Sequence, residues 1–134
     1  MAPHRRICRQ SPQYLPSAYF QAVPYTGNAT ASTAIATPGL SDLPPDLVWA
    51  KNRDQNDEWK ALDTARGATK ELNLDANNIE STGANGLTAF SGTDGFTLGT
   101  GADGYDDNAE DFIAYLWKEG ALPGFDIALY TGTG

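Results

Sequence analysis

The stretch Asp46-Leu47-Val48-Trp49-Ala50-Lys51-Asn52-Arg53 decides the fold class of this sequence. Four consecutive apolar residues pass into alternating polar ones, which is the pattern of a β-strand that leaves the core. The polar turn at 54–57 and the segment at 58–63 predict a second strand and a hairpin. Because at least one whole face of the first strand is apolar, we expect a central strand with Trp49 in the core, and we expect Trp117 in the core as well.

Other short segments between turn signals have the composition of strands, namely residues 19–25, 87–90, 96–98 and 125–130. Pro24 cannot donate a ladder hydrogen bond, so the first of these strands is expected at a sheet edge. Residues 111–118 fit either a helix with a capped start or an aromatic strand. The stretches between predict loops, with at most one weak strand in 28–45 and one helical turn in 64–85.

The composition agrees with a single all-β domain. The chain has 134 residues, of which 14 are glycine and 8 are proline, and only 19% are charged. This length supports one core, and this mixture favours strands joined by turns over helices. We therefore predict an extended, proline-rich N-terminal arm at 1–18, followed by one folded domain at 19–134.

Charge is unevenly distributed along the chain. The net charge is −8, but Arg5, Arg6 and Arg9 lie in the first nine residues, so six basic and seventeen acidic side chains remain beyond them and give −11. An acidic body repels phosphate backbones, so nucleic-acid binding is not expected. The arm also contains Tyr14 and Leu15. It is expected to be mobile alone and to become ordered against an acidic partner, such as another copy of this protein.

The sequence lacks the residues that several kinds of functional site require. Cys8 is the only cysteine and His4 the only histidine, which leaves no intrachain disulfide, no zinc cage and no nucleophilic triad. No pair of carboxylates lies in a recognisable hydrolase motif, so the protein is not expected to be an enzyme. No apolar run approaches the length of a membrane span, and the basic start lacks the apolar region of a secretory signal.

An acidic, glycine-rich loop at 99–110 is the candidate metal site. Asp103, Asp106 and Asp107 could contribute oxygen ligands to calcium, which takes about six to eight of them. The spacing is not that of an EF-hand, and a solvated loop without metal is the competing interpretation. No other cofactor is expected.

A second candidate site surrounds one tryptophan. Trp59 lies between charged residues near a turn, so it is expected to be exposed, beside Asn52, Asn56 and Asp57. An aromatic ring next to amides and a carboxylate is the arrangement expected of a glycan-binding site. This is the only local cluster of that kind in the sequence.

The last strand candidate repeats the first one. Residues 20–28 and 125–133 align without a gap, 105 positions apart, and share Phe, Tyr, Thr and Gly at the same offsets. The match suggests that residues 124–134 correspond to the start of a second repeat.

Several motifs in a fixed order carry a family resemblance. They are Phe-x-x-x-x-Tyr-Thr-Gly-Asn (20–28), Pro-Asp-Leu-Val-Trp-x-Lys-Asn-Arg (45–53), Leu-Asp-Thr-x-Arg-Gly-Ala-Thr-Lys (62–70), Leu-Thr-Ala-Phe with Asp-Gly-Phe-Thr-Leu-Gly (87–99), Tyr-x-Trp-Lys-x-Gly (115–120) and Gly-Phe-x-Ile-x-x-Tyr-Thr-Gly (124–132). This series resembles an uncharacterised phage domain that recurs, often in tandem, in tail-fibre and other virion proteins. The resemblance implies a β-sandwich of the jelly-roll or concanavalin-like kind, with a strand at 111–118.

Two functions remain in view. The leading hypothesis is a structural or decoration module of a phage virion, assembled in the host cytoplasm, that contacts other phage structural proteins and further copies of itself. The alternative is a lectin-like module of a tail fibre or spike that binds a glycan of the host surface. Capsid and tail locations both fit the sequence.

Overall fold

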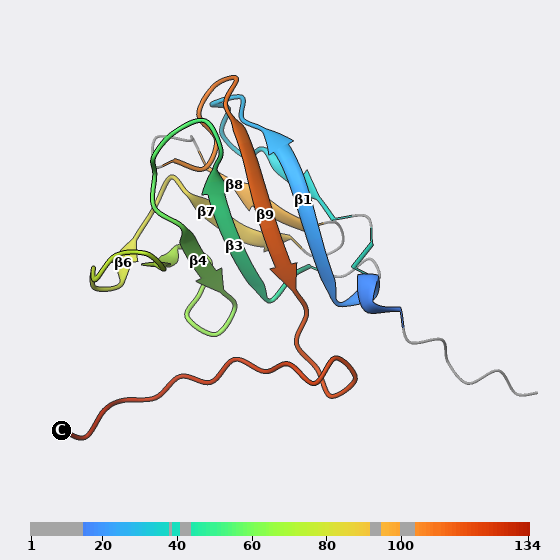
Figure 1. Cartoon of the computed structure of the whole chain (residues 1–134), viewed down its shortest axis with the longest axis vertical. Helices are drawn as coiled ribbons and strands as arrows, with labels where there is room; N and C mark the ends of the chain where they lie inside the picture. The colour runs from blue at the N-terminus through green and yellow to red at the C-terminus, as the bar shows by residue number, and fades with distance from the viewer. Residues whose placement is uncertain (1–14, 38, 41–43, 92–94, 100–103) are drawn as a thin grey trace, which may run out of the picture.

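Two antiparallel β-sheets packed together make up the protein (Figure 1). The computed structural model describes residues 15–37, 39–40, 44–91, 95–99 and 104–134. The larger sheet has six strands in the order β1-β9-β3-β4-β5-β6, and the smaller sheet has three in the order β2-β8-β7. The predicted all-β class is confirmed, in the form of a β-sandwich.

The strands are short and are joined by turns and loops. Their bounds are β1 (Phe20–Thr26), β2 (Ala34–Ala36), β3 (Leu47–Asn52), β4 (Lys60–Asp63), β5 (Lys70–Asn73), β6 (Ser81–Thr82), β7 (Leu87–Ser91), β8 (Gly95–Leu98) and β9 (Asp111–Trp117). A 3-10 turn, η1 (Pro16–Ala18), precedes β1 and begins at a proline, whose fixed φ suits the first position of a helical turn. Of the arm expected at 1–18, residues 1–14 lie outside the described part of the chain.

Most of the strand predictions are confirmed. β3 and β4 form the expected hairpin, in which Trp49 pairs with Ala61, and β7 and β8 form the other. The segment at 111–118, which fitted either a helix or a strand, contains β9. β1 lies at an edge of the large sheet, as Pro24 predicts.

Two local predictions are wrong. The loop expected at 64–85 contains β5 and β6, which extend the large sheet beyond β4. The apolar signal of a strand is missing at β5 because the side chain that it buries is Glu71, which accepts hydrogen bonds from Ser81 of β6 and from Tyr105. The strand expected at 125–130 does not form, and the edges of β9, the preceding strand, are occupied by β1 and β3.

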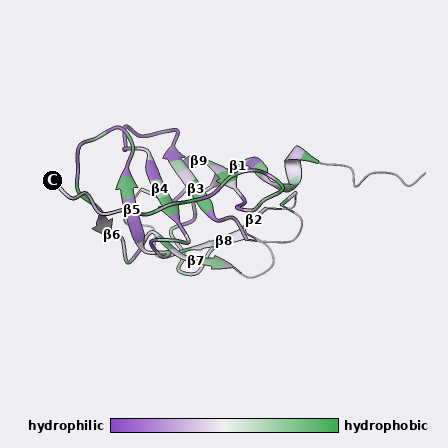
Figure 2. Ribbon diagram, turned by 90° about the horizontal axis from the view of Figure 1, so that it is seen from below, coloured by the Kyte–Doolittle hydropathy of each residue, from purple (hydrophilic) through white to green (hydrophobic). Residues whose placement is uncertain are grey.

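The core lies between the two sheets, and β9 shows how the sequence places it there. Phe112, Ala114 and Leu116 are buried, and they alternate with half-buried residues that face away from the small sheet. β3 alternates in the same way. Figure 2 shows the two layers edge-on. The buried apolar cluster that joins them consists of Ile35, Leu40, Val48, Ala50, Leu62, Leu87, Phe96, Leu98, Tyr105, Ala114 and Leu116.

Candidate ligand-binding face

Trp49 and Trp117 lie on the outer face of the large sheet, so their expected place in the core is wrong. The alternation that turns Val48 and Ala50 inward turns Trp49 outward, and the same holds for Trp117 after Leu116. Both indoles are half-buried. The error comes from interpreting the apolar run at 47–50 as a strand that is buried on both faces. In the structure only one face of this strand is buried, and Trp49 lies on the other.

A row of aromatic rings crosses this outer face. The centroids of Trp49 and Trp117 are 4.7 Å apart, and those of Phe20 and Trp117 are 5.1 Å apart. Tyr115 stacks on Trp59 at 5.9 Å and on Phe20 at 6.4 Å. The rings therefore join β1, β9, β3 and the residue that precedes β4, at separations typical of favourable aromatic pairs.

Strand register explains why an open groove lies among these rings. Tyr115 is opposite Ala22 of β1 on one side and Trp49 of β3 on the other, and Trp49 is opposite Ala61 of β4. The two alanines are small and leave space above the sheet. The groove has a volume of about 330 Å³ and is lined by Trp49, Trp59, Leu74, Tyr115 and Trp117.

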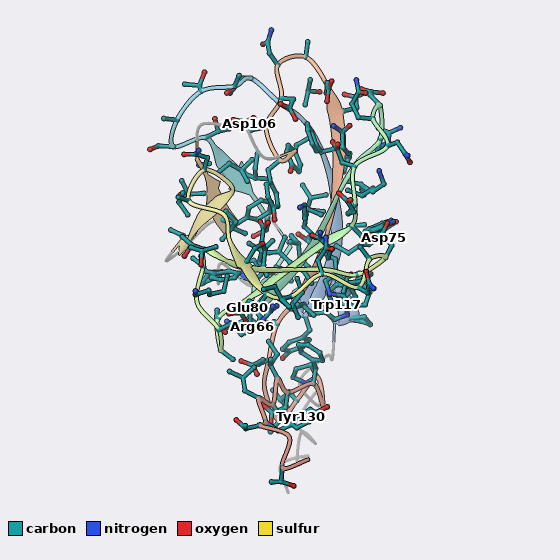
Figure 3. All side chains as sticks on the ribbon, turned by 90° about the vertical axis from the view of Figure 1, so that its left-hand side faces the viewer. Arg66, Asp75, Glu80, Asp106, Trp117 and Tyr130 are labelled. Carbon is teal, nitrogen blue, oxygen red and sulfur yellow. The ribbon has the colours of Figure 1, made fainter. Side chains whose placement is uncertain are left out.

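The far wall of the groove is fixed by backbone contacts. Trp59 donates its backbone N–H to the Asp75 carboxylate at 3.0 Å, and Leu74 donates its own N–H to the Trp59 carbonyl at 2.9 Å. Figure 3 shows Asp75 and Trp117 on the same side of the sandwich. The near end is fixed by Lys118, which follows Trp117 and forms an ion pair with Asp46 at 2.8 Å. These contacts hold the groove in shape without a ligand, and a preformed site would lower the entropic cost of binding one.

Two of the three polar residues predicted to accompany Trp59, Asn52 and Asp57, lie in a separate network that holds loops together. The Asn52 side chain, in a residue only 1% exposed, donates to Asp57 at 2.9 Å and to Glu110 at 2.6 Å. Its oxygen accepts from the backbone N–H groups of Asp54 and Gln55. Asn52 therefore shapes the hairpin loop and ties it to the start of β9. Asn56 is exposed in that loop.

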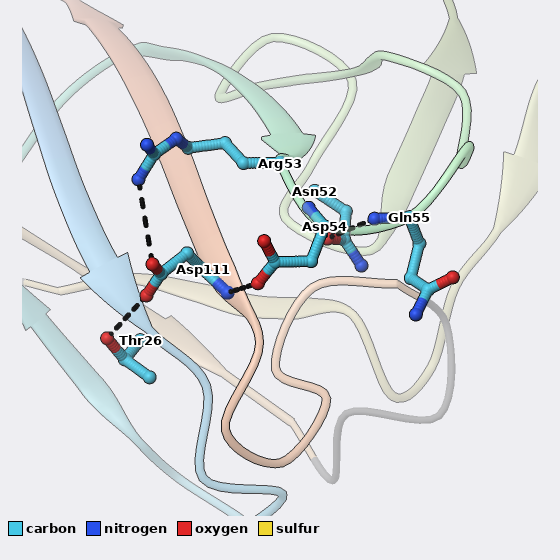
Figure 4. A network of polar contacts seen from close by, with 6 residues as sticks. All are labelled: Thr26, Asn52, Arg53, Asp54, Gln55 and Asp111. Carbon is cyan, nitrogen blue, oxygen red and sulfur yellow. Dashed lines mark hydrogen bonds and ion pairs between the residues drawn. The ribbon is translucent and has the colours of Figure 1, made fainter.

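A second set of contacts fastens the same loop to the sheet (Figure 4). Asp111 donates its backbone N–H to the Asp54 carboxylate at 2.6 Å, and its own carboxylate accepts from the Thr26 hydroxyl at 2.9 Å. Arg53 forms a longer ion pair with Asp111 at 3.8 Å, which is exposed and therefore contributes little. These contacts are structural, and Trp59 stacks on Tyr115 instead of joining them.

The candidate calcium residues are placed differently from the expectation. Asp106 is fully buried, and its carboxylate accepts the backbone N–H of Asn28 at 2.9 Å. Asp107 is half-buried, and Asp103 lies outside the described residues. In the described part of the chain, no three histidine, cysteine or acidic side chains gather closely enough to hold a metal ion.

Asp106 acts on a neighbouring tyrosine. Tyr25 packs against the core and donates its hydroxyl to the Tyr105 carbonyl at 2.9 Å. Burial, which disfavours the phenolate, raises the pKa of Tyr25 far above its ordinary range, and the negative charge of Asp106 raises this pKa further. Tyr25 is therefore a neutral hydrogen-bond donor at neutral pH.

Two buried polar clusters complete the large sheet. Asp63 binds Arg66 at 2.6 Å, and Arg66 also donates to the Ala61 carbonyl at 3.1 Å, which closes the turn after β4. On the inner face, Glu71 accepts from the Tyr105 hydroxyl at 2.7 Å and lies 3.5 Å from Lys60. The sequence did not indicate the Glu71 cluster, because its members lie 34 and 11 positions apart.

The fold and the groove define a class of protein: a β-sandwich domain with a row of aromatic side chains and a groove on the outer face of its larger sheet. The chain belongs to the family described as Domain of unknown function (DUF7483), whose model matches residues 15–134. No match was found among the curated proteins or among the solved structures. Within the described residues, no helix has the length and apolar character that a membrane crossing requires.

Proposed function

We propose that this domain binds a neutral glycan in the aromatic groove of its large sheet. The observation that carries the proposal is the gathering of three half-buried indoles and one phenol ring in a single preformed groove of about 330 Å³. Sugar rings present flat C–H surfaces, and aromatic faces bind such surfaces well. The volume is at the lower end of small-molecule sites, which suits a short stretch of a glycan chain.

The charge of the protein favours a neutral ligand over an anionic one. Seventeen acidic side chains face only nine basic ones, and the net charge is −8. Sulfated or uronic-acid-rich polymers would be repelled by this surface, whereas a neutral glycan would not. The walls of the groove are formed by apolar side chains, so binding depends on stacking more than on charge and should depend weakly on salt.

The motif resemblance supplies the biological setting of the proposal. On a phage particle, such a domain would attach the virion to glycans of the host surface. A structural role through contacts between copies is the second candidate function. It is supported by the exposed apolar side chains near the C-terminus, Leu122, Leu129 and Tyr130.

Glycan binding can be tested with defined ligands. Neutral and acidic oligosaccharides are screened on an array, and hits are titrated by tryptophan fluorescence. Trp59→Ala is expected to weaken binding about tenfold or more, equivalent to about 1.4 kcal/mol. Tyr130→Ala removes an exposed ring outside the groove and serves as the matched control. Failure of every neutral glycan to bind, or equal affinities for the wild type and Trp59→Ala, would overturn the proposal.

A further inference from the structure

Three residues of β1 and the glycine that follows it recur near the C-terminus, and these four make specific contacts in the structure. Phe20 packs against Trp117 with ring centroids 5.1 Å apart. Tyr25 stacks on Phe112 at 5.2 Å and reaches the Tyr105 carbonyl. The residues at the same offsets in the C-terminal segment are Phe125 and Tyr130.

The other two shared positions fasten the end of β1. Thr26 donates its hydroxyl to the Asp111 carboxylate at 2.9 Å. Gly27 donates its N–H to the Glu110 carbonyl at 2.9 Å, and a Cβ at this position would overlap the backbone of Asp107, so only glycine fits. Thr131 and Gly132 repeat this pair. Residues 125–133 thus carry the side chains that define the place of β1 beside β9.

In this structure the segment at 125–133 pairs with no strand of the described residues. An isolated bridge joins Gly120 and Phe125, and beyond Ile127 no backbone hydrogen bond is found within the described part of the chain. Leu129 is 59% exposed and Tyr130 is 93% exposed. Figure 3 shows Tyr130 well outside the body of the sandwich. An apolar, β-like segment in this state is suited to pairing with another chain.

Phe125 lines a pocket together with Phe20 of β1 and Trp117 of β9, and beyond it the chain runs away from its own β1. The Asp46 carboxylate pairs with Lys118 and accepts the backbone N–H of Glu119, both at 2.8 Å. The Glu119 carboxylate in turn accepts the N–H of Ile127 at 2.7 Å. After these contacts the segment runs below β3 and β4 towards the side of the sheet opposite β1 (Figure 1).

We propose that residues 125–133 act as a second version of β1. They dock beside β9 of another copy of this domain, in the place of that copy's own β1. The register of β1 on β9 would place Phe125 opposite Trp117 and Leu129 opposite Ile113 of the other copy. Two inward positions differ, since Ala128 replaces Val23 and Asp126 replaces Gln21. A chain's own β1 therefore fits beside β9 better than residues 125–133 of another copy do. The copies join when the β1 of the accepting copy is released and the segment of the other copy takes its place.

Crosslinking in the full chain tests the exchange. A Cys8→Ser background carries Ile113→Cys with Leu129→Cys, and a concentrated sample is passed through a mild urea cycle before a short bismaleimide is added. A covalent dimer is expected, and it should be lost when Tyr130→Ala is added. The pair Ile113→Cys with Pro24→Cys is the control for β1 in its own sheet. These two residues lie opposite each other in one chain, so this pair should crosslink within a single chain.

A third pair of cysteines distinguishes specific docking of the segment from crosslinks that form by random collision between chains. Ile113→Cys with Leu122→Cys places the second thiol on an exposed residue that does not correspond to any residue of β1, and it should give little dimer. The proposal fails if the Leu129 pair gives no more dimer than the Leu122 pair, if Tyr130→Ala leaves the dimer intact, or if the Leu129 pair crosslinks within a single chain. None of these outcomes depends on glycan binding, so the two proposals stand or fall separately.

Discussion

The indole of Trp49 lies with its centroid 4.7 Å from that of Trp117, and the two ring planes are inclined by 59°. The rings come from β3 and β9, which are neighbours in the sheet, and both face away from the core. Much of their apolar surface therefore remains available at the aromatic groove. The proposed binding therefore rests on half-buried rings that share one face of the sheet.

The position of Trp49 on the outer face leads to a stability prediction. Trp49→Ala should cost about 1–2 kcal/mol of the free energy of unfolding, because the ring is only half-buried. Leu116→Ala removes a side chain that is fully buried and should cost about 2–5 kcal/mol. Urea unfolding of both variants checks the order. A larger loss for Trp49→Ala would show that its ring belongs to the core after all.

The Glu71 cluster should be sensitive to the loss of its carboxylate. Glu71→Ala leaves the ammonium of Lys60 and the hydroxyl of Tyr105 without their buried partner, at an expected cost of about 3–5 kcal/mol. Tyr105→Phe removes one hydrogen bond to the same carboxylate and should cost about 1 kcal/mol. The comparison is made by thermal and urea unfolding, and equal costs for the two variants would contradict it.

Local sequence patterns predicted most of the strands and hairpins, whereas contacts between residues distant in the sequence were not predictable. The hairpin of β3 and β4 follows from its own turn, and Pro24 correctly indicated an edge strand. The outward position of Trp49 was also encoded, since the alternation of residues 47–52 puts Trp49 and Val48 on opposite faces. The groove, however, needs the register of β9 between β1 and β3, which no local pattern specifies.

The C-terminal segment shows a second limit of sequence-based prediction. Residues 125–130 have the composition of a strand and lack a partner in the sheets described here. Strand propensity reports how a segment fits a pleated surface, and a strand also needs a free edge to pair with. Asn52 was singled out as a ligand residue for a related reason, because amides that bind ligands and amides that organise loops are identical in sequence.

A glycine at the end of β1 is expected to tolerate no side chain. Gly27→Ala would push a methyl group into the backbone of Asp107, and overpacking of this kind typically costs about 1–3 kcal/mol. Gly132→Ala is the matched control, because nothing lies within 4 Å of the Cβ that it adds. Melting temperatures of the two variants provide the measurement. An unchanged melting temperature for Gly27→Ala would mean that the loop before β9 shifts easily to make room for the added methyl group.

The last prediction concerns alkaline pH. The pKa of Tyr25 is raised by burial and by Asp106, whereas a tyrosine of the unfolded chain ionises near pH 10. A raised pKa in the folded state means that the stability contributed by Tyr25 is complete below about pH 10 and is lost as the pH rises above it. Each further pH unit removes about 1.4 kcal/mol until the folded pKa is reached.

Tyr25→Phe isolates this contribution from those of other titrating groups. At pH 8 the variant should be about 0.5–1.5 kcal/mol less stable than the wild type, since it lacks the hydrogen bond to the Tyr105 carbonyl. At pH 11 the difference should vanish or change sign, because phenylalanine has no proton to lose in the unfolded chain. Urea unfolding at both pH values measures the difference, and Tyr130→Phe gives the effect of removing an exposed hydroxyl. A difference that stays constant between pH 8 and pH 11 would show that Tyr25 ionises in the folded protein as easily as in the unfolded one.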